Sequence, residues 1–502
     1  MLTNLAIGSA KAVCWQSFAA RNTAIGTRTM LTRILICVVL GYSVGNVFAG
    51  EFRITPDSDL KPVLKQVTPG DVIVLANGTW TDPKLKFESL AGTSDQPIQI
   101  RAESPGEVVL TGAIEFRVSG SHVTVSGLSF VNPVGTSDVF DFRTKSSIHA
   151  HDCRVTDCSF AQTESGSSKE SRWLNVYGTR NRVDHCYFAG KSNAGTTLVV
   201  WVAETPGSHR IDHNHFGPRP ELGKNGGETI RIGTSDVSEF VSKTIVEENY
   251  FERCNGEAEI VSNKSCENTY RHNLFERCQG ALTLRHGHRC LVDGNIFLGH
   301  QAKGTGGVRI IGSDHRVTNN YFEGLRGDAE RAAICLMNGI PDGPLNGYAP
   351  VTNALIAHNT LIDCKVSMEI GVSPSKRVTV VPSECLIIHN VFLPGKWELF
   401  RVQNKPDRFN WIGNKCQADA TRGADLVEMQ RVEIKLTRAE DGILRPTSSK
   451  TLQSDQPCEV EMDIDGEPRK AHFAGCDDPG TTFTIRDLEN TTGPIWRRPL
   501  KP

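Results

Sequence analysis

A short motif recurs through the middle of this 502-residue chain and limits the folds that the chain can adopt. The motif reads apolar residue, two variable residues, asparagine, one variable residue, and then phenylalanine or leucine. Its copies end at Phe216, Phe251, Phe275, Phe297, Phe322, Leu361 and Phe392. Earlier copies end at Phe130, Phe160 and Phe188, with Leu128, Cys158 and Cys186 in place of the asparagine. Successive copies are 22 residues apart at the closest (Phe275 to Phe297) and 39 at the widest (Phe322 to Leu361).

A repeat of this length, with strand-like runs, turns and no helical periodicity, predicts an all-β fold: a right-handed, single-stranded parallel β-helix. Like residues then stack from one coil to the next. The asparagines form a hydrogen-bonded ladder at an inward turn, and the phenylalanines stack beside it. The alternative, that these asparagines bind a ligand, would require a separate site in almost every coil. We therefore interpret the repeat as scaffold.

The position of the repeat divides the chain into three segments. Residues 1–49 form an export-signal region, in which Arg33 and the apolar run 34–40 precede small residues around Ala49, and Met30 is the expected true start. A buried helix of the fold is the alternative for this run, which is too short to span a membrane. Residues 50–415 form the β-helix. Residues 416–502 carry more charge and turns and are expected to add C-terminal coils or a cap to the same domain.

The export signal predicts a secreted or periplasmic protein with no membrane span after signal removal. The formal net charge of -2 argues against a nucleic-acid partner, which would favour a basic surface. Of 15 cysteines, Cys14 and Cys37 leave with the signal, and the odd number that remains cannot all pair within the chain. Four cysteines recur every twelve residues without a Cys-x-x-Cys motif: Cys254, Cys266, Cys278 and Cys290. This spacing argues against a zinc site built from these four and favours buried positions of the repeat.

Four turn-bounded segments collect charged residues on consecutive coils: 225–233, 255–261, 280–287 and 306–312. Residues about one period apart lie above one another in a β-helix, so these segments form one sheet. Its outer face and adjoining turns carry Asn225, Arg231, Glu257, Glu259, Lys264, Arg285, His286 and Arg309. Two carboxylates on one strand face repel each other and require a cation, and the lysine and arginines suit an anionic polymer.

These segments read Asn-Gly-Gly-Glu-Thr-Ile-Arg-Ile-Gly, Gly-Glu-Ala-Glu-Ile-Val-Ser-Asn-Lys-Ser, Leu-Thr-Leu-Arg-His-Gly and Gly-Gly-Val-Arg-Ile-Ile-Gly. The combination resembles polysaccharide lyase family 6, which contains alginate lyases and chondroitinase B. The resemblance is specific over about 225–325 and weaker from 51 to the C-terminus. It implies that Asn225, Glu257 and Glu259 bind Ca²⁺, that Lys264 is the general base and that Arg285 is the general acid. It also implies that Arg231, His286 and Arg309 contact the substrate, with a structural role as the alternative for His286.

The chemistry of such a lyase needs these residue types. β-Elimination removes the C5 proton beside a uronate carboxylate and expels the oxygen at C4. Calcium on that carboxylate neutralises it and stabilises the enolate-like charge that develops. Oxygen donors from two glutamates and one asparagine suit Ca²⁺ better than zinc. Lys264 must be neutral to accept the proton, whereas Arg285 stays charged in water and can stabilise the leaving oxygen as well as donate to it.

The expected substrate is an anionic polysaccharide, with alginate first and dermatan sulfate second. A β-helix hydrolase is a competing hypothesis, but its chemistry needs clustered catalytic carboxylates, and the only Asp-Asp pair, Asp477-Asp478, lies in the C-terminal tail. A third hypothesis is a non-catalytic β-helix that binds glycans, which would need neither a neutral lysine nor a metal site.

Overall fold

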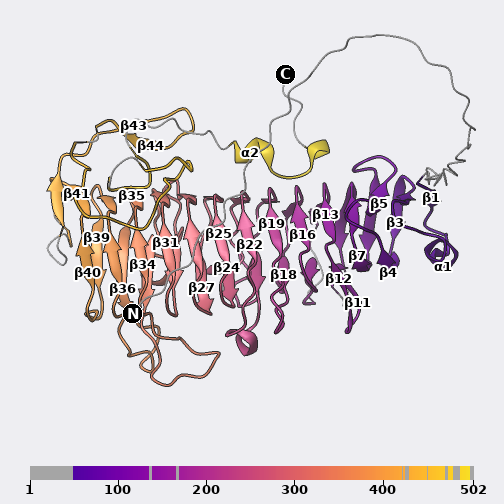
Figure 1. Ribbon diagram of the computed structural model, residues 1–502, viewed down its shortest axis with the longest axis horizontal. Helices are drawn as coiled ribbons and strands as arrows, with labels where there is room; N and C mark the ends of the chain where they lie inside the picture. Colours follow the sequence, from indigo (N-terminus) through magenta and orange to yellow (C-terminus); the bar gives the residue numbers. More distant parts are fainter. Residues whose placement is uncertain are drawn as a thin grey trace, which may run out of the picture. The chain divides into compact units, whose positions relative to one another are not determined.

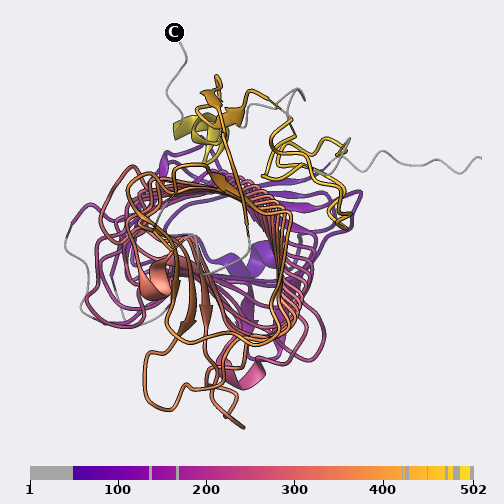
Figure 2. The same cartoon turned by 90° about the vertical axis from the view of Figure 1, so that its left-hand side faces the viewer.

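The computed structural model describes residues 49–134, 138–164, 169–420, 422–423, 429–448, 450–469, 473–478 and 487–497. The predicted export signal therefore lies outside the described residues, apart from Ala49. From Ala49 to Pro502 the chain forms one compact unit. Its described strands form three long sheets in which neighbouring strands are almost all parallel (Figure 1). Seen along the stack, the coils wind around a common core (Figure 2). The predicted parallel β-helix is confirmed.

Most coils contribute one strand to each of the three sheets, which we call A, B and C. Sheet A contains β1 (Glu51–Ile54), β2 (Val72–Leu75), β5 (Ile98–Ala102), β8 (Val123–Ser126), β13 (Arg154–Thr156), β16 (Arg182–Asp184), β19 (Arg210–Asp212), β22 (Ile245–Glu247), β25 (Thr269–Arg271), β28 (Leu291–Asp293), β31 (Arg316–Thr318), β34 (Leu355–Ala357), β37 (Leu386–Ile388) and β40 (Asn410–Ile412). Sheet B contains β3 (Gly78–Thr81), β6 (Val108–Gly112), β9 (Leu128–Pro133), β14 (Ser159–Ala161), β17 (Tyr187–Ala189), β20 (His215–Phe216), β23 (Tyr250–Glu252), β26 (Leu274–Glu276), β29 (Ile296–Leu298), β32 (Tyr321–Glu323), β35 (Thr360–Ile362), β38 (Val391–Leu393), β41 (Lys415–Gln417) and β42 (Gln430–Val432). Sheet C contains β4 (Lys84–Ala91), β7 (Glu115–Ser121), β10 (Phe140–Asp141), β11 (Arg143–Lys145), β12 (Ile148–His151), β15 (Leu174–Val176), β18 (Leu198–Val200), β21 (Ile230–Ile232), β24 (Glu259–Lys264), β27 (Ala281–His286), β30 (Val308–Ile310), β33 (Ile334–Met337), β36 (Val366–Val372) and β39 (Glu398–Val402).

The predicted asparagine ladder runs through the turn between sheets A and B. Its members are buried and follow one another as Asn214, Asn249, Asn273, Asn295, Asn320, Asn359, Asn390 and Asn414. Each side-chain amide donates to the side-chain oxygen of the next member at 2.9–3.0 Å. The residue before each asparagine has a positive φ, as at His272 (56°), and this bends the chain into the next strand. Beside the ladder, phenylalanine rings from Phe130 to Phe322 stack with centroids 4.2–5.2 Å apart.

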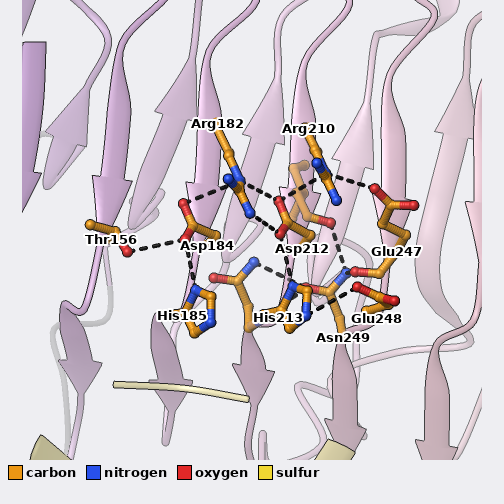
Figure 3. A network of polar contacts seen from close by, with 12 residues as sticks. Thr156, Arg182, Asp184, His185, Arg210, Asp212, His213, Glu247, Glu248 and Asn249 are labelled. Atoms are coloured by element: carbon orange, nitrogen blue, oxygen red, sulfur yellow. Dashed lines mark hydrogen bonds and ion pairs between the residues drawn. The ribbon is translucent and has the colours of Figure 1, made fainter. Parts of the chain in front are cut away.

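The outer face of sheet A carries a second ladder, made of charged side chains (Figure 3). Arg182 lies 3.5 Å from Asp184 and 2.5 Å from Asp212 on the next strand. Arg210 continues the series, and His213 bonds to Asp212 at 2.9 Å. Burial alone would raise the pKa of Asp184, but hydrogen bonds from neighbouring cations lower it well below its usual range. These ion pairs are held by the strand register and cross-link successive coils.

The two ends of the β-helix are covered differently. At the N-terminal end, α1 (Leu60–Leu64) packs Leu60, Val63 and Leu64 against the core. At the other end β42 is the last strand of sheet B, and β43 (Leu436–Arg438) pairs antiparallel with β44 (Leu444–Pro446). The chain then returns along the outside of sheet B, where Leu488 of α2 (Leu488–Thr491) packs near the middle of the stack (Figure 1). None of the helices described has the length and apolar composition of a membrane span.

The evenly spaced cysteines occupy interior positions, as predicted. Cys254, Cys266, Cys278 and Cys290 are at most 3% exposed. No disulfide joins any of the cysteines in the described ranges.

Candidate functional site

Four neighbouring strands of sheet C carry the charged residues that the sequence singled out. β21, β24, β27 and β30 pair in parallel, and their register places Arg231, Ser262, Thr283 and Arg309 in one row across the sheet. A register shift after Asn263 then pairs Lys264 with His286. The predicted site residues therefore lie on consecutive coils, although Lys264 faces His286 rather than Arg285.

Glu257 lies where two glycine-containing turns approach each other. Its Oε2 accepts hydrogen bonds from the backbone N–H groups of Gly226 (2.8 Å) and Gly227 (3.0 Å). A Cβ on Gly227 would lie 2.3 Å from the Gly256 carbonyl oxygen, and one on Gly256 would lie 2.1 Å from that of Gly227. Only glycine at both positions permits this approach. Burial, followed by the negative charges of Glu228 and Glu259, raises the pKa of Glu257 to about 7.

Behind these turns, the buried Arg219 holds the segment that carries Asn225 and Glu228. Its guanidinium donates to the backbone oxygens of Glu228 (2.6 Å) and Gly195 (3.0 Å) and to the Thr197 hydroxyl (3.1 Å). Burial lowers the pKa of Arg219 to about 10. Because Arg219 is only 4% exposed, it acts on this segment from inside the β-helix and does not face the solvent.

Glu259 connects the acidic cluster to two arginines. Its Oε1 lies 3.5 Å from Nη1 of Arg309 and 3.8 Å from Nε of Arg285, and its Oε2 accepts from the Ser262 hydroxyl at 2.6 Å. Both guanidinium groups rest against the ring of Tyr348, at 4.3 Å for Arg285 and 5.6 Å for Arg309. Arg309 also donates to the Tyr348 hydroxyl at 2.9 Å. Tyr348 thus fixes the two arginines relative to each other.

Lys264 and His286 differ sharply in their surroundings. Among the described residues, the Lys264 amine has no hydrogen-bond or ion-pair partner, and the side chain is partly exposed. His286 is 3% exposed, and its Nε2 lies 3.1 Å from the Ser235 hydroxyl. Burial and the charges of Arg285 and Lys264 lower the pKa of His286 to about 3, so the imidazole is neutral near pH 7. Arg231 lies at the edge of the site, over the Trp201 ring at 5.6 Å.

Two cavities open along this face. The first, of 330 Å³, is lined by Asn225, Glu257, Glu259, Arg309 and Arg331, among others. The second, of 460 Å³, lies toward later coils and is bordered by Lys303, Arg326, Arg331 and Lys365. Arg331 lines both cavities, so the two lie next to each other.

The donor set of the first cavity fits a hard divalent cation. Within the described ranges, neither Glu257 nor Glu228 has an ion-pair partner, and burial together with the negative charges of Glu228 and Glu259 disfavours the ionised form of Glu257. Asn225 adds an amide at the cavity wall. Carboxylate and amide oxygens are the ligands that Ca²⁺ prefers.

Three residues of this site were not assigned from the sequence. Glu228 stands in the same glycine-rich segment as Asn225, and its position as a third acid could have revealed it. Arg219 lies in a loop with no motif. Tyr348 arrives on the long connection between β33 and β34, and no spacing rule predicts where such an insertion folds.

The Asp-Asp pair considered for a hydrolase is not part of the site. Arg445 binds Asp477 at 3.1 Å, and Arg469 binds Asp478 at 2.5 Å, so both carboxylates are engaged in ion pairs of the tail.

Comparisons with known proteins point to one family. The chondroitinase B family model matches residues 54–392, while a comparison with curated protein sequences gave no match. Among solved structures, the PL6 family alginate lyase AlyGC is 35% identical with a TM-score of 0.77. That match covers 87% of this chain and 59% of AlyGC, so the chain spans less than two thirds of that enzyme.

A second solved structure is matched over nearly its whole length. A mannuronic acid specific polysaccharide family 6 lyase from human gut microbiota is 31% identical, with a TM-score of 0.65, over 77% of this chain and 92% of the other. A PL6 alginate lyase in complex with a trisaccharide, 22% identical with a TM-score of 0.71, shares the fold. With the family model matching two thirds of its length, and with its β-helix and site geometry, this chain belongs to the chondroitinase B family, polysaccharide lyase family 6.

Proposed function

We propose that this protein is a lyase that cleaves a uronate-containing polysaccharide, with alginate as the main substrate, by β-elimination. One observation carries the proposal: Glu259, part of the acidic cluster, lies against both Arg285 and Arg309. Lys264, on the same strand as Glu259, has no partner among the described residues. The comparisons support a lyase of this family, and two of the solved relatives are described as alginate lyases. Dermatan sulfate is the second candidate substrate, because the family model is that of chondroitinase B.

Ca²⁺ is the proposed cofactor, with Asn225, Glu257 and Glu259 as ligands and Glu228 as an added candidate. When bound, calcium would neutralise the uronate carboxylate and so make the C5 proton more acidic. The backbone N–H groups of Gly226 and Gly227 fix Glu257 in place, while Ser262 orients Glu259. This chain therefore presents its carboxylates already positioned, which limits the reorganisation needed on binding.

Lys264 is the proposed base. Its amine has no partner among the described residues, so it is free to accept the C5 proton once neutral. The neighbouring His286 is itself neutral near pH 7 and holds a fixed position against Ser235. We propose that His286 packs beside Lys264 and contacts the sugar ring.

Arg285 is the proposed acid, or the group that stabilises the leaving O4. Its guanidinium is oriented by the carbonyl oxygens of Gly347 (3.1 Å) and Asn346 (3.4 Å) and by the ring of Tyr348. Burial lowers the pKa of Arg285, which favours proton donation relative to an exposed arginine. Arg309 and Arg231 remain the proposed contacts to substrate carboxylates on either side.

The test is to incubate the purified protein with alginate and with dermatan sulfate, with and without EDTA. Formation of the unsaturated uronate is followed by its ultraviolet absorbance, and new reducing ends are counted in parallel. We expect absorbance to rise only with metal present. Reducing ends without that absorbance would establish a hydrolase, and binding without cleavage would establish a glycan-binding protein; either result refutes the proposal.

Two variants test the assigned roles. Lys264→Ala and Arg285→Ala should each lower turnover by at least about 100-fold, the scale of general acid–base catalysis, with unchanged unfolding curves. Lys435→Ala and Arg408→Ala are matched controls, since both side chains are well exposed at the C-terminal end. Activity retained in either site variant would remove that residue from the mechanism.

We also propose that the protein is secreted or periplasmic, because the apolar run 34–40 follows a basic residue and precedes small residues near Ala49. N-terminal sequencing of the mature protein from the producing cells tests this. A mature chain that begins close to residue 50 is expected, and one that retains residues 30–49 would refute it.

A further inference from the structure

Two buried histidines lie one above the other at the turn between sheets A and B, away from sheet C. His358 and His389 each precede a ladder asparagine, with φ of 53° and 55°. Their ring centroids are 4.9 Å apart, and both side chains are at most 1% exposed. The C-terminal tail covers them: the Ser454 hydroxyl lies 2.9 Å from Nε2 of His389, and Gly475 N–H donates to the His389 carbonyl at 2.8 Å. The scaffold alone does not require histidine here, since Gly294 and Gly413 occupy equivalent positions.

Cys458 completes this cluster from the tail. It is the one cysteine in the described ranges that is not buried. One ligand atom from each of Cys458, His358 and His389 lies within 4.8 Å of the other two. Cys458 also borders a cavity of 700 Å³, together with Glu459.

The geometry is close to that of a tetrahedral metal centre. His389 Nδ1 and His358 Nε2 are 3.3 Å apart. Zinc–nitrogen bonds of about 2.05 Å and a zinc–sulfur bond of about 2.3 Å give edges of about 3.3 Å between nitrogens and about 3.6 Å between nitrogen and sulfur. The distance between the two histidine nitrogens already matches the tetrahedral edge, and the thiol needs to move closer by at most about 1.2 Å.

The surroundings supply what such a centre needs. The hydroxyl of Ser454 at Nε2 of His389 is the kind of partner that fixes the tautomer of a metal-bound imidazole. Arg469, whose charge acts on His358, is itself paired with Asp478 at 2.5 Å.

We propose that His358, His389 and Cys458 form a site for a divalent transition metal, with Zn²⁺ as the first candidate, that fastens the C-terminal tail to the β-helix. On binding, the Cys458 thiol releases its proton to solvent and binds as thiolate, and the imidazoles bind as neutral ligands. A water from the adjoining cavity takes the fourth position. The site differs from the calcium site in its ligands, because nitrogen and sulfur select zinc over calcium. It does not depend on the proposed lyase activity.

The test uses the full chain, freed of metal by chelator and titrated with Zn²⁺ by calorimetry. We expect one zinc per chain and a higher melting temperature with zinc, neither of which excess Ca²⁺ reproduces. Cys458→Ser should weaken zinc binding at least about 100-fold. His300→Ala, which removes a histidine exposed on another turn, should bind zinc like the wild type. Absence of stoichiometric zinc binding by the wild type overturns the proposal, as does unchanged affinity in Cys458→Ser.

Cobalt gives a measurement that needs no variant. Co²⁺ bound through a thiolate produces a charge-transfer band in the near ultraviolet, together with the visible bands of tetrahedral coordination. Both are expected for the wild-type chain. Cobalt bound without the charge-transfer band would mean that Cys458 is not a ligand and would refute the three-residue site.

Discussion

Replacing one asparagine in the middle of the ladder tests how the scaffold is stabilised. The side-chain amide of Asn273 donates to the carbonyl oxygens of Val246 (2.9 Å) and Arg271 (3.0 Å) and to Oδ1 of Asn295 (2.9 Å). Its Oδ1 accepts from the backbone and side-chain N–H groups of Asn249, both at 3.0 Å. Asn273→Ala removes all of these contacts from a buried site. Because the amide has two hydrogens, its three donor contacts amount to two full hydrogen bonds, and the total of about four at about 1 kcal/mol each gives a loss of about 4 kcal/mol.

Asn414, at the end of the ladder, is the matched control. It accepts two hydrogen bonds from Asn390 and donates one to the Ile387 carbonyl, and it is equally buried. Asn414→Ala should therefore cost about 3 kcal/mol, or about 1 kcal/mol less than Asn273→Ala. Equilibrium unfolding in urea measures both free energies, and far-ultraviolet circular dichroism confirms that the variants fold. If Asn273→Ala loses no more than Asn414→Ala, the stacked amides do not act as a ladder.

Three further predictions concern the site and its support. Tyr348→Ala should lower kcat about 10-fold, because the guanidinium groups of Arg285 and Arg309 lose the ring against which they pack. Tyr348→Phe keeps the ring and should lower kcat less; equal losses in the two variants would locate the effect in the hydroxyl alone. Lys303→Ala combined with Lys365→Ala should raise KM about 10-fold for long oligosaccharides and leave short ones unaffected, because these two lysines line only the second cavity, which a short chain does not reach; an equal rise for short ones would contradict this. Stability should be greatest between about pH 4 and 6.5. The lowered pKa of Asp184 stabilises the fold fully above its unfolded value of about 3.9 and progressively less below it, and the raised pKa of His213, bonded to Asp212, does so fully only below about 6.5. Urea unfolding across pH measures this, and Asp184→Asn should flatten the acid side; an unchanged profile would refute it.

The sequence predicted the scaffold well because the ladder is a local pattern that repeats. Asn273 and Phe275 occupy the same two positions in each coil, so their stacking follows from one register. The same logic placed Glu259 and Arg309 on β24 and β30, two steps apart in sheet C, with Glu257 just before β24, since one coil is one step of the sheet.

The rest of the site depends on contacts that repeat nowhere. The connection bearing Tyr348 folds back 62 residues to reach Arg285, where Gly347 accepts a hydrogen bond from it. The register shift that sets Lys264 opposite His286 is a single irregularity within β24 and β27. The return of the tail along sheet B brings Trp496 to Asp157, 339 positions apart in the chain. Such contacts arise from tertiary packing, and periodicity contains no information about them.

The strand register of sheet C also limits how such an enzyme can change its substrate. Every side chain that faces the two cavities is attached to one strand of sheet C. The separation between two such residues along the stack therefore changes only in steps of about 4.8 Å, the spacing between strands. A polymer with another spacing between its charges cannot be matched by sliding a strand, because the ladder locks all the coils together. Adaptation must instead come from side-chain length and from insertions at the turns, as Tyr348 illustrates. The spacing between strands is therefore constant, and substrate specificity changes only through the side chains and turn insertions that the strands carry.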